Sequence, residues 1–259
     1  MHLPAFLIIY LVAALADSVG FIKSNYFVTF GYTLSVFADA LTILIMYKGS
    51  MGLITTILTI VIMIYSARLG IYIYLRGKKE SYQNKIKDVY TGNSNMSFSA
   101  MCPMWLGCAL IYACEVAPIL FRVKNGTSND LMLCLGFLLS TSGAVIESLA
   151  DQQKYNAKKV NPTSFVSTGL YQIVRCPNYL GEILVWTGVF VSGIPAYRGF
   201  WQWSAALFGY VCITFVMLAA ARTLEIRQNK SYGEDEKYQK YIKTTPILIP
   251  GVPIYSLEK

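Results

Sequence analysis

Histidine is almost absent from this chain: of 259 residues, only His2, at the terminus, is one. The six cysteines show neither a CxxC pair nor the Cys/His spacing typical of a metal site. Most of them fall inside apolar segments, where a thiol is a small hydrophobic group. We therefore expect no metal centre and no histidine-based catalytic dyad.

Charge is also scarce. Only 14% of the residues are charged and 55% are hydrophobic, with a mean hydropathy of +0.47, whereas about a quarter of a typical soluble domain is charged. Apolar runs of about 20 residues, long enough to cross ~30 Å of hydrocarbon, recur along the chain. We predict an all-α polytopic membrane protein with one domain, 1–259, and with spans at 3–21, 28–47, 51–75, 99–121, 131–149, 179–197 and 201–221. The first run has no basic segment before it, so we expect a retained span rather than a cleaved signal peptide.

The 22 Lys and Arg residues outnumber the 14 Asp and Glu residues. They cluster at span ends and in loops, as orienting charges do, so we expect no nucleic-acid partner. The loops after the third, fifth and seventh spans, the first of which is the polar segment 78–97, carry most of them. This bias predicts an external N-terminus and a cytoplasmic C-terminus, in a bacterial inner membrane or the endoplasmic reticulum. No obligate protein partner is evident.

The segment from Glu147 to Glu182 mixes charged, amide, aromatic, Gly and Pro residues between two apolar runs. Four charged residues recur at i, i+4, i+7 and i+11, which is one face of a helix: Glu147, Asp151, Lys154 and Lys158. A solvated helix end shows the same periodicity. The Asn161-Pro162 pair would end this helix, and Pro177 suits the first turn of the next one.

Several of these side chains suit a nucleotide. Bases that can neutralise phosphate are Lys154, Lys158, Lys159 and Arg175. Asp151 and Glu182 can accept hydrogen bonds from ribose hydroxyls. The free N–H groups at the helix start near Pro177 favour an anion. We therefore interpret the segment as a nucleotide-holding one on the inner face of a membrane enzyme.

After the last span, Arg222 and Glu225 lie at the membrane boundary, where they can close over whatever this segment binds. Tyr238 and Tyr241, three residues apart, can place an aromatic face against a base. An interfacial amphipathic helix with snorkelling lysines is the alternative for this stretch.

Three acids lie in or near the spans: Asp17, Asp39 and Glu115. Ionisable groups in hydrocarbon usually face a cavity or a partner. At 1.5 Å per residue, Asp39 and Tyr65 lie at a similar depth, roughly 16 Å, so they can meet across neighbouring helices. Alternatively, Asp39 bonds a hydroxyl of Thr33 or Ser35. For Glu115 we expect a structural role.

Arg68 follows Tyr65 by three residues and shares its helix face. Together they offer a proton donor and an anion clamp to one cavity. The alternative is that Arg68 snorkels to the headgroups.

A series of motifs occurs in fixed order: E-x-x-x-D-x-Q-K (147–154), G-L-Y (169–171), R-x-P-N-Y-x-G-E (175–182), R-x-x-E (222–225), Y-x-x-Y (238–241) and P-x-x-x-P-G (246–251). In this combination the chain resembles the steroid 5-alpha-reductase family, most closely its bacterial members. The resemblance is strong over the C-terminal half and extends weakly to the Y-x-x-R pair, Tyr65 and Arg68.

The resemblance implies a seven-helix bundle in which residues 98–259 hold NADPH and residues 1–97 form the substrate side, with a lipophilic, steroid-like substrate entering from membrane lipid. It implies these cofactor contacts: Arg68, Glu147, Asp151, Lys154, Lys158, Arg175, Asn178, Tyr179, Glu182, Arg222, Glu225 and Tyr241. Among them, Asn178 and Glu182 would contact the nicotinamide end. Tyr65 would polarise the 3-oxo group of a Δ4 steroid, with Asp39 as the paired acid. Such a reaction needs a hydride donor and a group that stabilises enolate charge, and neither requires a metal.

One departure separates two related reactions. Sterol C=C reductases and isoprenylcysteine carboxyl methyltransferases commonly show R-H-P where this chain has Cys176, and in the methyltransferases that histidine belongs to the adenosylmethionine site. Its absence argues against a methyltransferase, which stays the main alternative beside a reductase of another lipid enone or sterol double bond. A seven-helix transporter or receptor is the third class, but internal repeats are missing.

Overall fold

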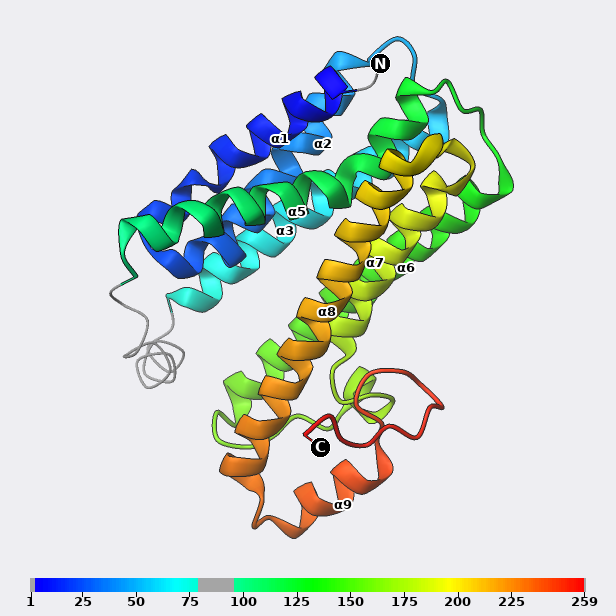
Figure 1. The fold of residues 1–259 in the computed structure, drawn as a ribbon. Coiled ribbons are helices and arrows are strands. Elements are labelled where there is room, and N and C mark those ends of the chain that lie inside the picture. Colours follow the sequence, from blue (N-terminus) through cyan, green and yellow to red (C-terminus); the bar gives the residue numbers. More distant parts are fainter. Residues whose placement is uncertain (1–2, 79–95, 259) are drawn as a thin grey trace. The chain divides into compact units, whose positions relative to one another are not determined.

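The computed structural model describes residues 3–78 and 96–258 (Figure 1). Over these residues the secondary structure is helical and contains no strand. Seven helices are long and apolar enough to cross a membrane. The predicted all-α polytopic membrane fold is therefore confirmed. His2 and nearly all of the predicted loop 78–97 lie outside the described residues.

The helical elements follow one another in this order: α1 (Leu3–Asp17), η1 (Ser18–Phe21), η2 (Ser24–Tyr26), η3 (Phe27–Gly31), α2 (Tyr32–Met46), α3 (Leu53–Gly77), α5 (Phe98–Lys124), α6 (Leu131–Val160), η4 (Gly169–Gln172), α7 (Pro177–Gly193), η5 (Ile194–Ala196), α8 (Gly199–Tyr232) and α9 (Glu236–Thr244). Each predicted span coincides with a long helix to within a few residues, except at the C-terminal ends of α6 and α8. Those two helices continue through polar sequence because Pro162 is the first helix breaker after α6, and Gly233 follows α8 directly.

The chain forms two compact units. Unit 1 consists of Met1–Leu138 and Gly188–Tyr210, and unit 2 of Leu139–Thr187 and Val211–Lys259. The division into substrate and cofactor regions at residue 97 concerns function and stays a prediction.

In unit 1, α1, α2, α3 and α5 pack side by side (Figure 1). Between α1 and α2 the chain passes through two 3₁₀ segments and the π-helical η3. Irregular backbone at membrane depth needs polar partners from the protein. The Tyr112 hydroxyl of α5 supplies one, donating to the Phe27 carbonyl at 2.8 Å, and Trp105 Nε1 donates to the Ala14 carbonyl at 2.6 Å.

Arg122 behaves differently from the orienting loop charge that we expected. It lies within α5 and is almost fully buried. Its Nη1 donates to the Ser192 carbonyl at 2.6 Å, and its Nη2 donates to Asp130 at 2.7 Å. A buried guanidinium with these partners ties three stretches of unit 1 together.

Candidate functional site

In unit 2, α6 and α7 approach each other through two glycines. A Cβ placed on Gly181 would lie 2.7 Å from the Gly143 carbonyl oxygen and 2.7 Å from the Glu147 backbone nitrogen. A Cβ on Gly143 would lie 2.5 Å from the Gly181 carbonyl oxygen. These atoms are backbone and cannot give way, so glycine at both positions allows the two backbones to touch.

This contact gathers buried acids. On α6, Glu147 and Asp151 continue the face that begins at Gly143, and on α7 Asn178 is within one turn of both Gly181 and Glu182. Glu147, Asp151 and Glu182 are all buried. The amide oxygen of Asn178 is buried too, and the described residues give it no hydrogen-bond donor. A polar, acceptor-rich region therefore surrounds the first turns of α7.

Arg175 precedes α7 and is buried. Its Nη2 forms an ion pair with Glu225 of α8 at 2.7 Å and donates to the Tyr255 carbonyl at 2.8 Å. The backbone N–H groups of Arg175 and Cys176 donate to the carbonyls of Pro246 and Ile247, each at 2.9 Å. The chain after α9 thus binds the two N–H groups just before α7; the predicted anion preference of the first turn of α7 itself stays a prediction.

Two other residues that were predicted to contact the cofactor, Glu225 and Arg222, bind the segment after α9. Glu225 accepts the Leu257 N–H at 2.8 Å, and the exposed Arg222 donates from Nε to the Leu257 carbonyl at 3.1 Å. Asn229, one turn further along α8, donates to Glu258 at 2.7 Å. Tyr179 packs against the apolar cluster of Cys176, Ala221, Ile247 and Leu248.

The four charged residues predicted to share one face of a helix all lie on α6. The last of them, Lys158, binds other parts of the protein. Lys158 is half-buried and donates to the carbonyls of Pro162 and Ser164 and to the Tyr232 hydroxyl. It thereby holds the turn that follows α6. Lys154 lies one turn earlier and is partly exposed.

The tyrosines of α9 face inward. Tyr241 stacks on Phe165 with ring centroids 5.5 Å apart, and its hydroxyl donates to the Tyr171 carbonyl at 2.7 Å. Tyr238 is fully buried, and its hydroxyl donates to Asn229 at 2.8 Å. Burial raises the pKa of Tyr238 to about 12 and moves the pKa of Tyr241 in the same direction, so both hydroxyls stay protonated as donors.

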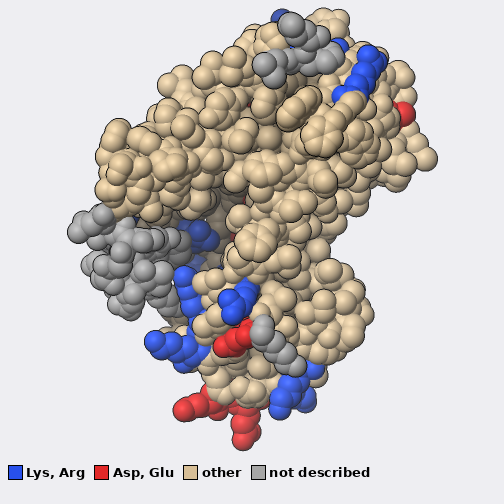
Figure 2. All heavy atoms as spheres, in the orientation of Figure 1, with Lys and Arg blue, Asp and Glu red and all other residues tan. Residues whose placement is uncertain are grey.

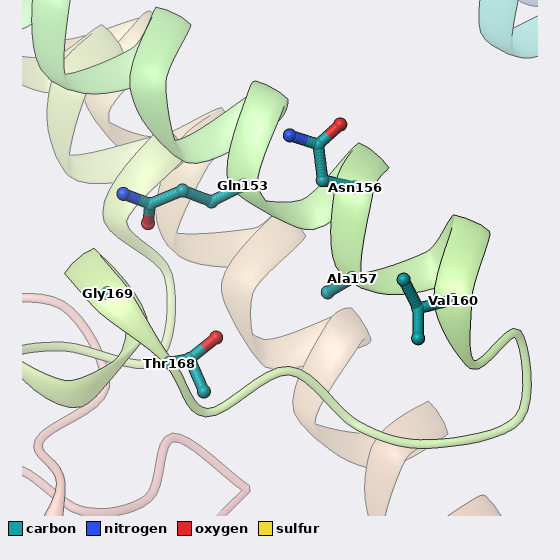
Figure 3. Close-up of a pocket in the computed structure, with 6 residues that line it drawn as sticks. All are labelled: Gln153, Asn156, Ala157, Val160, Thr168 and Gly169. Carbon is teal, nitrogen blue, oxygen red and sulfur yellow. The ribbon is translucent and has the colours of Figure 1, made fainter.

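A pocket of about 370 Å³ lies between α6 and the loop that follows it (Figure 3). Gln153, Asn156, Ala157 and Val160 line it from α6, and Thr168 and Gly169 line it from the following loop. Gln153 accepts the Leu170 N–H at 2.9 Å, which fixes that loop. None of the predicted site residues lines this pocket.

In Figure 2, charged side chains gather at the lower end of the face of unit 2 that is shown.

The predicted catalytic residues belong to unit 1. Asp39 on α2 and Tyr65 on α3 are both buried, and these helices pack together. The alternative partners of Asp39 are engaged elsewhere, because Thr33 donates to the Phe30 carbonyl and Ser35 to the Ala13 carbonyl. Among the described residues nothing donates a hydrogen bond to either Asp39 oxygen.

Arg68 is half-buried, with its guanidinium carbon 5.9 Å from the Tyr72 ring centroid. Unit 1 also has a groove of about 500 Å³, lined mainly by apolar side chains of α2 and α3 with hydroxyls from Thr33, Ser66 and Tyr74; Asp39, Tyr65 and Arg68 are not among its lining residues.

The family described as "Protein of unknown function (DUF1295)" matches residues 19–245, most of the chain. The chain belongs to this family. The DUF1295 family is associated with steroid 5-alpha-reductase-like membrane proteins. No curated protein and no solved structure matches the chain.

Several features of this DUF1295 protein were not predicted. The contact between Gly143 and Gly181 and the clasp of Asn229 on Glu258 depend on residues far apart in the sequence. Burial also raises the pKa of the Cys176 thiol to about 11, so it stays neutral. Over the described residues, no group of three or more His, Cys, Asp or Glu side chains is arranged to hold a metal ion.

Proposed function

We propose that this DUF1295 protein is an integral membrane reductase that uses NADPH to reduce the C4–C5 double bond of 3-oxo-Δ4 steroids or of a related lipid enone. The observation that carries the cofactor assignment is the buried Asn178 amide oxygen, which lacks a donor among the described residues. The carboxamide of a nicotinamide ring brings two N–H donors, so it matches this acceptor.

In this proposal Asn178 and Glu182 hold the nicotinamide end, and Asp151 with Glu147 accepts hydrogen bonds from ribose. Lys154 and Arg222 neutralise phosphate, since both are at least partly exposed in unit 2. Tyr179 packs beside them. Bound NADPH would supply hydride.

Four residues for which the resemblance implied direct cofactor contact have another role in this proposal: Arg175, Glu225, Lys158 and Tyr241. Each already binds the protein's own carbonyls, carboxylates or loops. We assign them the role of holding the loops around the cofactor residues.

On the substrate side, Tyr65 would donate a hydrogen bond to the carbonyl oxygen and Asp39 would act as the acid. Stabilising the developing enolate oxygen is the main electrostatic task of such a site. The mainly apolar groove of unit 1 is suited to a lipophilic molecule, although Asp39 and Tyr65 do not line it. We propose that the cofactor residues face the cytoplasm, as the positive-inside bias predicts.

The second candidate is an adenosylmethionine-dependent carboxyl methyltransferase of the isoprenylcysteine type. Its relatives place a histidine where this protein has the buried, neutral Cys176, and a neutral thiol does not replace an imidazole as donor and acceptor. We therefore favour the reductase.

The test begins with titration calorimetry of the purified protein in detergent with NADPH and, separately, with adenosylmethionine. NADPH oxidation with a panel of Δ4-3-oxo steroids then tests the reaction. Tyr65→Phe should lower turnover by about 10²–10³-fold while NADPH still binds, because one donor to the developing oxyanion is lost. Tyr47→Phe, at the partly exposed end of α2, is the matched control. Binding of adenosylmethionine alone would refute the reductase assignment.

A further inference from the structure

Two buried acids lie where α1 packs against α2. We call this contact, formed around Ala13, Asp17, Ser35 and Asp39, the α1–α2 seam. Asp17, at the end of α1, and Asp39, on α2, are both 0% exposed. The described residues donate no hydrogen bond to any of their four carboxylate oxygens. An ionised carboxylate in such a place is strongly disfavoured, because burial removes its hydration and nothing replaces it.

Gly31 shows what surrounds Asp17. A Cβ built on Gly31 would lie 1.7 Å from Asp17 Oδ1 and 2.9 Å from the Tyr26 carbonyl oxygen. Both oxygens therefore border the space that any side chain at position 31 would fill. Two acceptors facing the same small space attract each other only if a proton or a cation lies between them. A protonated Asp17 would donate to the carbonyl of Tyr26, where the irregular backbone of η3 begins.

The seam continues from Asp17 towards Asp39. Asp17 and Ala13 lie one turn apart on α1, and Ser35 and Asp39 lie one turn apart on α2. The buried Ser35 hydroxyl donates to the Ala13 carbonyl at 3.0 Å. It thus lies between the two acids, at about 6 Å along α2 from Asp39. Ser18, the residue after Asp17, is exposed, so Asp17 stands at the surface end of the seam.

The neighbouring elements carry few ionisable groups that could compensate a negative charge. On α5 the groups that interact electrostatically around Asp17 are Cys108, Tyr112 and Glu115, which are neutral or acidic. The ionisable residues of α3, which packs against α2, are Tyr65, Arg68, Tyr72, Tyr74 and Arg76. Lys23, in the connection between η1 and η2, is exposed. The described residues form no ion pair with Asp17 or Asp39.

We propose that the α1–α2 seam is a proton-holding site in which Asp17 and Asp39 are neutral carboxylic acids, and that Asp17 resupplies Asp39 with the proton that enone reduction consumes. The second half of this inference rests on the proposed function. Bound NADPH would supply hydride to C5; the C4–C5 π electrons would then form a C3–C4 double bond while the carbonyl becomes an enolate, and Asp39 would give its proton to C4. The Asp39 carboxylate would then recover a proton that starts at Asp17 and is carried by water past the Ser35 hydroxyl, and Asp17 would recover one from bulk water.

The test uses infrared spectroscopy of the full chain in lipid at neutral pH, in H₂O and D₂O. The carboxylic acid C=O stretch, which shifts in D₂O, should lose one component in Asp17→Asn and another in Asp39→Asn. The amide in Asp17→Asn keeps a donor for the Tyr26 carbonyl, so this variant should fold. Ser18→Ala is the control and should leave both components. A spectrum in which both variants remove only ionised-carboxylate bands, including bands that respond to Na⁺, would overturn the proposal.

A kinetic measurement tests the resupply step. Asp17→Asn should reduce steady-state NADPH oxidation by roughly 10²-fold, as loss of a proton-transfer group does, and should raise the solvent deuterium isotope effect because proton supply becomes limiting. Unchanged turnover with an unchanged isotope effect would refute the resupply role. The infrared result does not depend on NADPH or steroid, so failure of the reductase assignment and failure of the proton-holding site are separate outcomes.

Discussion

Arg175 and Glu225 form a buried ion pair, with Nη2 and Oε1 2.7 Å apart, although 50 residues separate them in the sequence. Each also binds the main chain of the segment after α9, Arg175 at the Tyr255 carbonyl and Glu225 at the Leu257 N–H. The pair therefore connects the start of α7, the C-terminal part of α8 and the last described residues. Both side chains were predicted to contact a cofactor, and their geometry assigns them first to holding this end of unit 2.

The pair predicts a large effect on stability. Glu225→Gln leaves the buried guanidinium of Arg175 without its counter-charge, which typically costs about 3–5 kcal/mol. We expect a much lower midpoint of thermal unfolding in detergent. Glu236→Gln, an exposed acid at the start of α9, is the control and should change little. Equal behaviour of the two variants would show that the ion pair does not stabilise unit 2.

The glycine contact predicts a second effect. Gly181→Ala places a methyl group 2.7 Å from backbone atoms of α6, so the helices must separate. Overpacking of this kind costs about 1–3 kcal/mol. Gly107→Ala on α5 is the matched control, because nothing lies within 4 Å of its Cβ position and alanine favours the helix. Thermal unfolding of both variants checks this, and a stable Gly181→Ala would contradict the close approach.

The spans were predictable because a membrane imposes a length and a composition on each helix. The seven predicted runs correspond to seven helices, and Asn161-Pro162 and Pro177 mark the observed end of α6 and start of α7. The irregular stretch from η1 to η3 was not predictable, since its backbone depends on partners from α5 such as Tyr112. Burial of Arg122 was missed for the same reason: its partners lie in other segments of unit 1.

The site was predictable as a set of residue types and much less as a set of contacts. Helical spacing correctly placed Glu147, Asp151, Lys154 and Lys158 on one helix. Spacing alone did not show that Lys158 would bind its own following turn, or that Tyr241 would stack on Phe165. The partner of each side chain depends on which groups tertiary packing brings next to it, and spacing along one helix does not show this.

The contact between Arg122 and Asp130 predicts a pH dependence. Burial alone would raise the pKa of Asp130, but hydrogen bonds from Arg122 and from the Leu133 N–H outweigh it and lower the pKa below its usual value. A carboxyl whose pKa is lower in the folded state stabilises the fold above its unfolded pKa, about 3.9. That stabilisation is lost as the pH falls through the folded pKa.

We therefore expect the unfolding temperature of the wild-type protein to fall more steeply between pH 5 and pH 3 than that of Asp130→Asn, which cannot titrate there. The neutral variant should be the less stable of the two at pH 7, because Arg122 stays buried without its counter-charge. Parallel pH profiles for the two proteins would show that the Asp130 carboxyl does not couple to folding.

Asn178 gives the most direct test of the cofactor site. Its amide oxygen is buried and receives no donor from the described residues, so a ligand that supplies an N–H group gains a hydrogen bond without displacing one. Such a bond contributes about 0.5–1.5 kcal/mol, which is up to about tenfold in Kd. Asn178→Leu should weaken NADPH binding by that factor and should not weaken folding, because in the unliganded protein it removes an unsatisfied acceptor.

Asn156→Leu is the control, since that exposed amide lies on the face of α6 that lines the pocket. Titration calorimetry with NADPH measures both variants. If Asn178→Leu binds NADPH as tightly as Asn156→Leu does, the nicotinamide end does not lie at the start of α7, and the residues around Gly181 must be assigned to another ligand.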